Sequence, residues 1–356
     1  MKANIALLPG DGIGPEVVSA AVAVLECIAA KYQHQFDMQS YLIGGCAIDA
    51  CGQALPEDTQ KACMAADAVL LGAVGGPQWS DPKASVRPEQ GLLQLRALLN
   101  VFANVRPVKV FPRAAQFSPL KAERLEGVDF VFVRELTGGS YFGKKSRTTD
   151  TATDECRYTK VEIERVAHKA FQLAQARRKK VTSIDKANVL ETSRLWRETV
   201  NQVATIYPDV TLEHQLVDSM AMLLLTRPAE YDVLLTENLF GDILTDEAAV
   251  LAGSLGLLPS ASLGMGSRGL YEPIHGSAPD IAGQSIANPI GCILSVALML
   301  RYSFGLDIEA QQIEQAVGTV VAHAELTRDL FGQANTQQIT QAVITEIHQQ
   351  AESKAA

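Results

Sequence analysis

Residues 4–28, NIALLPGDGIGPEVVSAAVAVLECI, decide which folds this chain can adopt. Residues 4–8 predict a strand, residues 9–14 predict a loop, and apolar residues from Pro15 onward recur at helical spacing. The loop is close to the dinucleotide fingerprint G-x-G-x-x-G, but Pro15 stands where the last glycine is needed. This stretch therefore disfavours a Rossmann phosphate loop and indicates a tight glycine-rich turn near a ligand.

The alternation of strand and helix continues along the chain, which predicts an α/β fold with a mostly parallel sheet. A length of 356 residues favours about two domains. Strands are expected at 36–42, 68–72, 108–111, 128–133, 181–185, 210–216 and 232–236, and helices at 57–64, 161–176, 193–206, 292–300 and from 308. The Gly/Pro-rich segment 253–291 is long for a connection, which indicates a function. The basic run 177–180 is interpreted as charge matched to a helix C-terminus.

Composition narrows the class of protein. The 31 Lys+Arg and 40 Asp+Glu residues give a net charge of −9, which argues against a nucleic-acid partner. The six cysteines form no metal-binding or disulfide pattern and are interpreted as mostly buried thiols in a reducing compartment. Neither a signal peptide nor a membrane-spanning run is evident. We therefore expect a soluble cytoplasmic protein with no membrane partner.

Polar side chains follow three consecutive predicted strands. Lys186 and Asn188 follow the first strand, Asp218 follows the second, and Asn238 and Asp242 follow the third. Ligands in open α/β sheets bind beyond the carboxyl ends of the strands. These side chains therefore indicate one site.

Asp242 and Asp246 are four residues apart, so on a helix both carboxylates share one face. Hard oxygen ligands of this kind suit Mg²⁺ or Mn²⁺. The alternative is that Asp242 caps the helix and Asp246 is a solvated acid in its first turn. Asp218, as a third carboxylate, favours the metal.

Three arginines, Arg96, Arg106 and Arg134, are candidate binders of carboxylates, because a guanidinium matches a carboxylate with two hydrogen bonds. The alternative for each arginine is a surface ion pair, which is the more usual role of this residue type. Tyr141 and Lys186 are a plausible proton donor and acceptor beside a metal-bound hydroxyl. His275 stands in a glycine-rich loop and is interpreted as a hydrogen-bonding loop residue rather than a catalyst.

Several motifs occur in order along almost the whole chain: LLPGDGIGPE from Leu7, GLLQLR from Gly91, FANVRP from Phe102, VRELTGGSYFG from Val133, DKANVLE from Asp185, NLFGDILTDEA from Asn238, HGSAPDIAG from His275 and IANP from Ile286. With these motifs the sequence resembles the isocitrate/isopropylmalate dehydrogenase family of metal-dependent β-decarboxylating dehydrogenases. The resemblance implies a two-domain fold that is not Rossmann. It places 1–101 plus 254–356 in a first domain and 102–253 in a second, which carries the contacts of a homodimer.

The resemblance also implies an activity, the NAD-dependent oxidative decarboxylation of 3-isopropylmalate, a step of leucine biosynthesis. Arg96, Arg106 and Arg134 would bind the malate carboxylates. Asp242, with Asp246 nearby and Asp218 from the partner, would hold Mg²⁺ or Mn²⁺. Lys186 would accept the hydroxyl proton and Tyr141 would protonate the enolate carbon, while Lys186, Asn188, Val189 and Asp218 would serve the site of the partner subunit.

Cofactor contacts and substrate choice are implied in the same way. The residues that would bind NAD are Glu272, His275, Gly276, Ser277, Ala278, Asp280, Ile281, Asn288 and Asn188. Asp280 would bind the ribose hydroxyls and repel a 2′-phosphate, which favours NAD over NADP. Glu89 would line the substrate segment, and Leu92 and Leu93, with Val189 from the partner, would form an apolar pocket for an isopropyl group. The alternative for the two leucines is helix core.

Two residues depart from the family pattern. Thr245 stands where serine is usual, and Glu237 stands where glycine is expected and adds a negative charge near the site. Two rival functions stay open. A sister dehydrogenase for isocitrate, homoisocitrate, tartrate or malate would prefer a polar residue at position 92 or 93. A non-catalytic dicarboxylate-binding protein would have no use for Lys186 and Tyr141.

Overall fold

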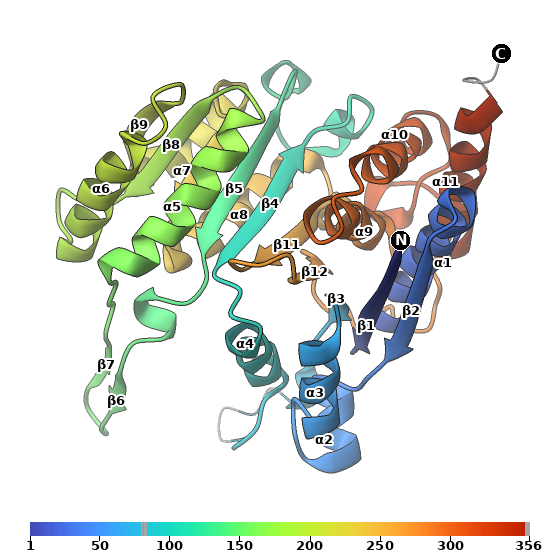
Figure 1. Ribbon diagram of the computed structural model, residues 1–356, viewed down its shortest axis with the longest axis horizontal. Coiled ribbons are helices and arrows are strands. Elements are labelled where there is room, and N and C mark those ends of the chain that lie inside the picture. Colours follow the sequence, from blue (N-terminus) through green and yellow to red (C-terminus); the bar gives the residue numbers. More distant parts are fainter. Residues whose placement is uncertain (80, 82–83, 353–356) are drawn as a thin grey trace. The chain divides into compact units, whose positions relative to one another are not determined.

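The computed structural model describes residues 1–79, 81 and 84–352 (Figure 1). The chain forms two compact units. The first contains Met1–Asn100, Phe111–Phe117 and Ser254–Ala356, and the second contains Val101–Val110 and Ser118–Gly253. Residues 111–117, which the sequence-based division gives to the second domain, pack with the first unit.

The five strands of the first unit lie in the order β2-β1-β3-β12-β11. Strand β1 is parallel to β2 and β3, β3 is parallel to β12, and only the β11–β12 pair is antiparallel. All six residues of β3 are buried, as expected of a central parallel strand. The strands are β1 (Lys2–Gly10), β2 (Gln35–Ser40), β3 (Ala68–Ala73), β11 (Pro259–Leu263) and β12 (Gly269–Pro273).

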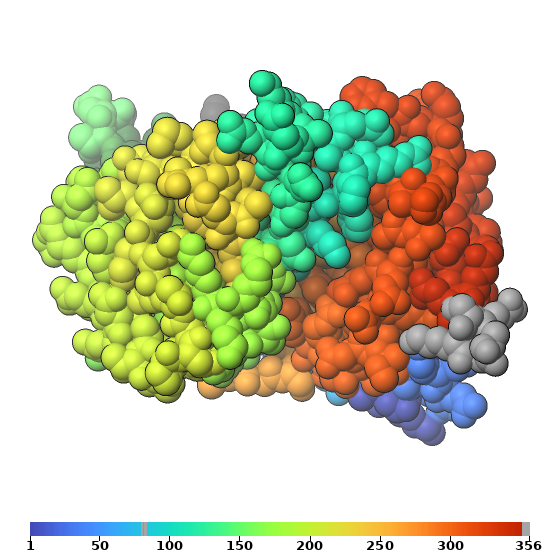
Figure 2. All heavy atoms as spheres, turned by 90° about the horizontal axis from the view of Figure 1, so that it is seen from above, coloured from blue at the N-terminus to red at the C-terminus, as the bar shows by residue number. Residues whose placement is uncertain are grey.

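Two helices of the first unit, α1 and α9, pack on these strands, and α10 and α11 pack on them. Helix α9 is apolar on every side, and its residues Ile290–Leu300 are all buried, so it forms the centre of this core. In the space-filling view, the atoms coloured orange to red, toward the C-terminal end of the colour bar, form one continuous surface (Figure 2). The helices are α1 (Gly14–Tyr32), α2 (Gly45–Cys51), α3 (Glu57–Ala65), α4 (Pro88–Leu98), α9 (Ile290–Tyr302), α10 (Asp307–His323) and α11 (Thr336–Glu352).

Five strands of the second unit lie side by side in the order β4-β5-β10-β8-β9. Only the β4–β5 pair is antiparallel. A small exposed hairpin, β6–β7, projects from the body of this unit (Figure 1). The strands are β4 (Ala103–Lys109), β5 (Asp129–Glu135), β6 (Lys145–Arg147), β7 (Ala152–Asp154), β8 (Lys180–Asp185), β9 (Thr211–Leu216) and β10 (Val233–Thr236).

Helices cover both faces of the second unit's five side-by-side strands. Helices α5 and α6 pack together on one face, and α7 and α8 pack on the other (Figure 1). Helix α5 begins at a capping box in which Thr159 and Glu162 bond each other's backbone N–H groups. The helices are α5 (Lys160–Gln175), α6 (Glu191–Ala204), α7 (Val217–Thr226) and α8 (Asn238–Ala249).

The predicted α/β class with a mostly parallel sheet is confirmed. Helix α1 begins at Gly14 and has Pro15 in its first turn, where a missing N–H costs no hydrogen bond. Four strands were missed: the short β6 and β7, and β11 and β12, which lie inside the segment 253–291 that was interpreted as a connection. The last two lack the usual sequence signals. Their sequences, PSASL and GLYEP, lack the alternation and the β-branched residues that predict strands.

The interpretation of the basic run 177–180 was wrong. Arg177 binds the carboxylates of Asp129 and Asp232 at 2.7 and 2.8 Å, so it joins two strand starts rather than balancing a helix end. Asp232 is 1 % exposed and also accepts a hydrogen bond from the backbone N–H of Arg178 at 2.8 Å. Lys180 is the first residue of β8.

The interpretation of the cysteines was only partly right. All six are free thiols, but only Cys63 and Cys292 are buried. Cys27 and Cys46 are half-buried, and Cys51 and Cys156 are exposed. Within residues 1–79, 81 and 84–352, no helix is long and apolar enough to cross a membrane.

We predict that Asp232→Ala lowers the free energy of unfolding by about 3 kcal/mol, because it removes one of the two carboxylates that bind Arg177 and the acceptor of the Arg178 backbone N–H. Urea unfolding measures the change. Asp154→Ala is the control, since Asp154 is exposed and lies 3.9 Å from Lys145; it should change stability by about 0.5 kcal/mol at most. Equal effects of the two substitutions would contradict the prediction.

Candidate functional site

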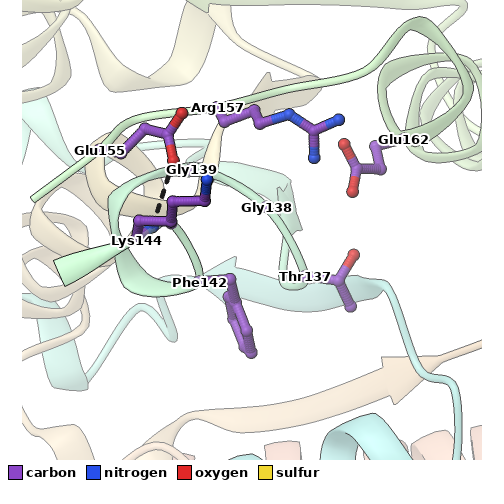
Figure 3. A pocket seen from close by; sticks show the side chains of 9 residues that line it. Thr137, Gly138, Gly139, Phe142, Lys144, Glu155, Arg157 and Glu162 are labelled. Atoms are coloured by element: carbon purple, nitrogen blue, oxygen red, sulfur yellow. Dashed lines mark hydrogen bonds between the residues drawn. The ribbon is translucent and has the colours of Figure 1, made fainter.

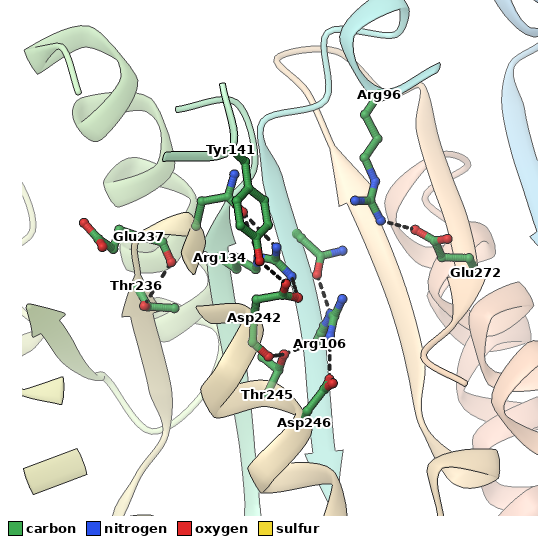
Figure 4. A network of polar contacts seen from close by, with 12 residues as sticks. Arg96, Arg106, Arg134, Tyr141, Thr236, Glu237, Asp242, Thr245, Asp246 and Glu272 are labelled. Carbon is green, nitrogen blue, oxygen red and sulfur yellow. Dashed lines mark hydrogen bonds and ion pairs between the residues drawn. The ribbon is translucent and has the colours of Figure 1, made fainter. Parts of the chain in front are cut away.

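Helix α8 presents Asp242 to the end of strand β5 (Figure 4). The Arg134 guanidinium binds the Asp242 carboxylate, and the Tyr141 hydroxyl donates to the same carboxylate at 2.5 Å. Arg134 is 3 % exposed, and its Nε and Nη2 atoms also donate to Asn238 Oδ1 at 3.1 and 2.8 Å. The second unit therefore brings together three of the predicted site residues: Arg134, Tyr141 and Asp242.

This contact network sets the ionisation of its members. Burial opposes ionisation of Asp242, but the charge of Arg134 and the hydrogen bond from Tyr141 outweigh it, so the pKa of Asp242 lies below its usual value. Burial raises the pKa of Tyr141, and the hydrogen bond to Asp242 raises it further. At neutral pH the site thus holds a charged carboxylate beside a protonated phenol.

Arg106, on β4, contacts helix α8 one turn after Asp242. Its Nη1 donates to Thr245 Oγ1 at 2.8 Å and lies 3.6 Å from Asp246, and its Nε donates to Asn104 Oδ1 at 2.7 Å (Figure 4). Asn104 and Thr245 were not predicted as site residues. A signal for Asn104 was available, because positions 104 and 106 share one face of a strand.

The structure excludes the alternative in which Asp242 caps its helix. Helix α8 begins at Asn238, so Asp242 is in its second turn and does not cap it. Asp246 lies one turn further on, with a side chain 71 % exposed. The two acids therefore share a face of the helix.

Asp218 and Lys186 form a separate pair. Asp218 is in the first turn of α7, and its carboxylate accepts from Lys186 Nζ at 2.5 Å. This hydrogen bond lowers the pKa of Asp218. Asn188 and Val189 follow Lys186 in an exposed turn. In the part of the chain that the structure describes, no three Asp, Glu, His or Cys side chains are placed to hold a metal ion, so Asp218 does not complete a group with Asp242 and Asp246.

In the first unit, Arg96 on α4 binds Glu272 on β12 at 2.8 Å (Figure 4). Both side chains are about one-tenth exposed, and the Arg96 Nε atom is buried without a hydrogen-bond partner. Leu92 is half-buried and Leu93 is exposed, whereas Leu95 is fully buried. The leucine that forms helix core is therefore Leu95. Glu89 lies in the first turn of α4 and is exposed.

The loop after β12 carries the predicted cofactor residues. His275 Nδ1 donates to the Gly276 carbonyl at 2.9 Å, which fits its interpretation as a loop residue, and burial lowers its pKa. Asn288 is buried and donates to Asp329 at 2.9 Å. Gly276 and Asp280 are exposed, Ser277 is buried, and Ala278 and Ile281 are half-buried. The loop thus offers backbone groups and one exposed carboxylate to a ligand.

Glu237 precedes α8, and its side chain points away from Asp242 (Figure 4). Thr236 is paired with Arg134 and with Ile184, so the next residues, Glu135, Glu237 and Asp185, form a row across three parallel strands. All three carboxyl groups are buried.

The two outer members of this row have partners. Glu135 accepts from the backbone N–H groups of Thr137 and Gly138 at 2.8 and 2.7 Å, and Asp185 is bound by Arg197 at 2.8 and 2.9 Å. Glu237 Oε2 has no hydrogen-bond partner. Burial, together with the charges of Glu135 and Asp185, raises the pKa of Glu237 to about 7.

Two cavities lie away from the Arg134–Tyr141–Asp242 contacts and from the row of buried carboxyl groups. One, of about 410 Å³, is lined by residues of the Gly138–Gly139 turn together with Phe142, Lys144, Glu155 and Arg157 (Figure 3). The other, of about 700 Å³, lies in the first unit beside α1 and α11. None of the predicted site residues lines either cavity.

The sequence matches the family model described as isocitrate/isopropylmalate dehydrogenase over residues 4–343. The chain belongs to this family. It is 60 % identical over 336 residues to the 3-isopropylmalate dehydrogenase of Bacillus licheniformis, covering 93 % of this chain and 91 % of that protein. It is 55 % identical over 352 residues to the enzyme of the same name from Anaeromyxobacter dehalogenans, covering 98 % and 100 %.

Solved structures of family members have the same fold. Isocitrate dehydrogenase from Methylococcus capsulatus matches with a TM-score of 0.85 and 37 % identity, covering 97 % of this chain and 99 % of that one. A β-decarboxylating dehydrogenase from Thermococcus kodakarensis matches with a TM-score of 0.82 and 38 % identity, covering 98 % and 96 %. The prediction of a family fold that is not Rossmann is confirmed.

We predict that Glu237→Gln stabilises the protein increasingly as pH rises. The folded state holds this proton up to pH 7 whereas the unfolded state releases it near pH 4.5, so wild-type stability falls as pH rises through this window. The advantage of the Gln variant should grow by about 2 kcal/mol between pH 5 and pH 8, measured by urea unfolding. Glu126→Gln, at an exposed position, is the control, and its effect should be the same at both pH values.

Proposed function

We propose that this chain catalyses the NAD-dependent oxidative decarboxylation of 3-isopropylmalate to 2-oxoisocaproate, in leucine biosynthesis. The observation that carries the proposal is identity of 55–60 % to 3-isopropylmalate dehydrogenases over nearly the whole chain. The position of Leu92 and Leu93 supports it, because neither is helix core and both lie on the helix that carries Arg96.

The three arginines are assigned to the two carboxylates of the substrate. Arg134 and Arg106 are held by Asn238, Asn104 and Thr245, so their guanidinium groups are oriented before the substrate arrives. Arg96 has a buried Nε–H without a partner, which is a donor suited to a carboxylate oxygen.

A divalent cation fits the donor set. Asp242 and Asp246 supply hard oxygen ligands from one face of α8, and the proposal takes a further carboxylate from the partner's Asp218. When bound, Mg²⁺ or Mn²⁺ would polarise the 2-hydroxyl and stabilise the negative charge that develops as CO₂ leaves.

Two side chains are assigned to proton transfer. Lys186 of the partner subunit accepts the hydroxyl proton as the hydride leaves C2. Tyr141 protonates the carbon after CO₂ has left, and its raised pKa means that it still carries a proton at neutral pH.

The loop 275–281, with Glu272, Asn288 and Asn188, is assigned to NAD. Exposed loop backbone and the exposed Asp280 carboxylate suit a dinucleotide whose ribose carries free hydroxyls.

A homodimer completes the proposal. Helices α7 and α8 expose Met222 and Ile243, which are 59 % and 61 % exposed, so an apolar face on these helices is available to a second copy. The pairing of Asp218 with Lys186 rather than with Asp242 also supports a site shared between two subunits. Val189, 60 % exposed beside Lys186, would reach the partner's substrate pocket.

A sister substrate is the second candidate, because an isocitrate dehydrogenase is among the matching structures. NADH formation with Mg²⁺, compared for 3-isopropylmalate, isocitrate, tartrate and malate, tests the proposal. We predict that kcat/KM is highest for 3-isopropylmalate, and that it exceeds the value for malate by more than about tenfold because an apolar pocket favours the isopropyl group. Preference for isocitrate would refute the role of Leu92 and Leu93, and no NADH with any acid would refute the catalytic assignment.

We predict that Asp280→Lys raises the KM for NAD by about tenfold, because it removes a charged acceptor of the ribose hydroxyls. The KM for 3-isopropylmalate should change less than twofold. Steady-state kinetics with NAD and with NADP measure both effects. Unchanged kinetics with NAD would contradict the role of Asp280.

A further inference from the structure

The loop 275–285 is attached to the start of helix α1 at two points. The backbone N–H of Ile13 donates to the Ser277 carbonyl at 2.8 Å. Glu16, in the first turn of α1, accepts through Oε1 a hydrogen bond from the backbone N–H of Gly283. The glycine-rich turn that the sequence analysis placed near a ligand thus contacts the loop assigned to the cofactor.

Gly12 permits the first attachment. Its φ of +59° is a conformation that residues with a side chain rarely adopt. A Cβ added at Gly12 would lie 1.9 Å from the Ser277 carbonyl oxygen, which is far inside van der Waals contact. The Ile13–Ser277 hydrogen bond therefore requires a glycine at position 12.

The attached loop is under backbone strain. Ala278, directly after Ser277, has a φ of +37°, and Ser285, near the second attachment, has a φ of +55°. Non-glycine residues in this region persist only where their surroundings hold them, and they concentrate at ligand-binding segments. The contacts to Ser277 and Gly283 flank Ala278, so they are placed to maintain its conformation.

We propose that Gly12, Ile13 and Glu16 are positioning residues that hold the loop 275–285 in its cofactor-binding conformation and thereby set the affinity for NAD. The inference rests on the proposed function, in which this loop binds NAD. The three residues act through Ser277 and Gly283. The affected step is dinucleotide binding, whereas the carboxylate-binding arginines and the proton-transferring side chains are not altered.

The first test replaces Glu16. Fluorescence titration with NADH measures the Kd, and steady-state kinetics give kcat and the two KM values. Glu16→Ala should raise the Kd for NADH and the KM for NAD by about tenfold, because a backbone donor loses a charged acceptor. The KM for 3-isopropylmalate, and kcat at saturating NAD, should stay within twofold.

Glu16→Gln separates the hydrogen bond from the charge. Both variants remove a negative charge from the first turn of α1, where it favours the helix. Only the Gln variant keeps an oxygen that can accept from Gly283. We expect Glu16→Gln to restore the Kd for NADH to within threefold of wild type. A Gln variant as weak as the Ala variant would overturn the positioning role of the hydrogen bond.

The second test replaces Gly12 and has a matched control in the same unit. Gly52 has a φ of +73°, and a Cβ added there meets no atom within 4 Å. Gly12→Ala and Gly52→Ala therefore impose similar backbone strain, but only the first forces Ser277 to move. Gly12→Ala should weaken NADH binding more than tenfold, and Gly52→Ala should leave it unchanged.

The outcomes distinguish this inference from the proposed function. If wild-type protein binds no NADH, the cofactor assignment fails, and the inference fails with it. If wild type binds NADH and Glu16→Ala binds it equally well, only the inference is overturned, whether or not the variant melts at a lower temperature. If Gly12→Ala does not fold, the Glu16 pair decides the question alone.

Discussion

The register of the parallel strands β5, β10 and β8 is the constraint on which the chemistry of the second unit depends. Thr236 is opposite Arg134 and Ile184, so Arg134 faces α8 and meets Asp242, while the following residues of the three strands face the other way. Those residues are Glu135, Glu237 and Asp185. A slip of one residue would exchange the faces, burying the arginine away from its helix. The contact between Arg134 and Asp242 and the row of buried carboxyl groups both follow from this one register.

The first unit positions its functional groups mainly through backbone contacts. Gly10 and Gly12 bring the turn after β1 against the carbonyls of Ala73 and Ser277, where a Cβ would lie about 2 Å away. The buried Asp11 carboxylate accepts from the backbone N–H groups of Gly45 and Gly75, both at 2.7 Å. One turn therefore fixes three loops. Gly10 and Gly12 are required for this close packing of backbone against backbone. The turn does not depend on a glycine at position 15, so Pro15 can stand where a phosphate-binding fingerprint has its last glycine.

The elements with strong periodicity or long apolar runs were predictable, as α5, β3 and β8 show. The segment holding β11 and β12 was not, because hydrogen bonding to neighbouring strands makes them strands despite sequences rich in Pro, Gly and Ser. Site residues could be named from motifs, but the pairing of Arg134 with Asn238 depends on a register between distant segments. The same register places Glu237 beside the buried carboxyl groups of Glu135 and Asp185. An acid is tolerated there because the buried side chain can remain protonated and uncharged.

Within one chain, each acid assigned to the metal already has a cationic partner. Asp242 binds Arg134, Asp218 binds Lys186, and Asp246 lies beside Arg106. A cation must therefore compete with these ion pairs, which lowers its affinity for the protein alone. A substrate carboxylate that takes over Arg134 and Arg106 would release the acids. Under the proposed function, the dicarboxylate and the cation would then strengthen each other's binding by linkage, and the site would favour the two ligands together over either alone.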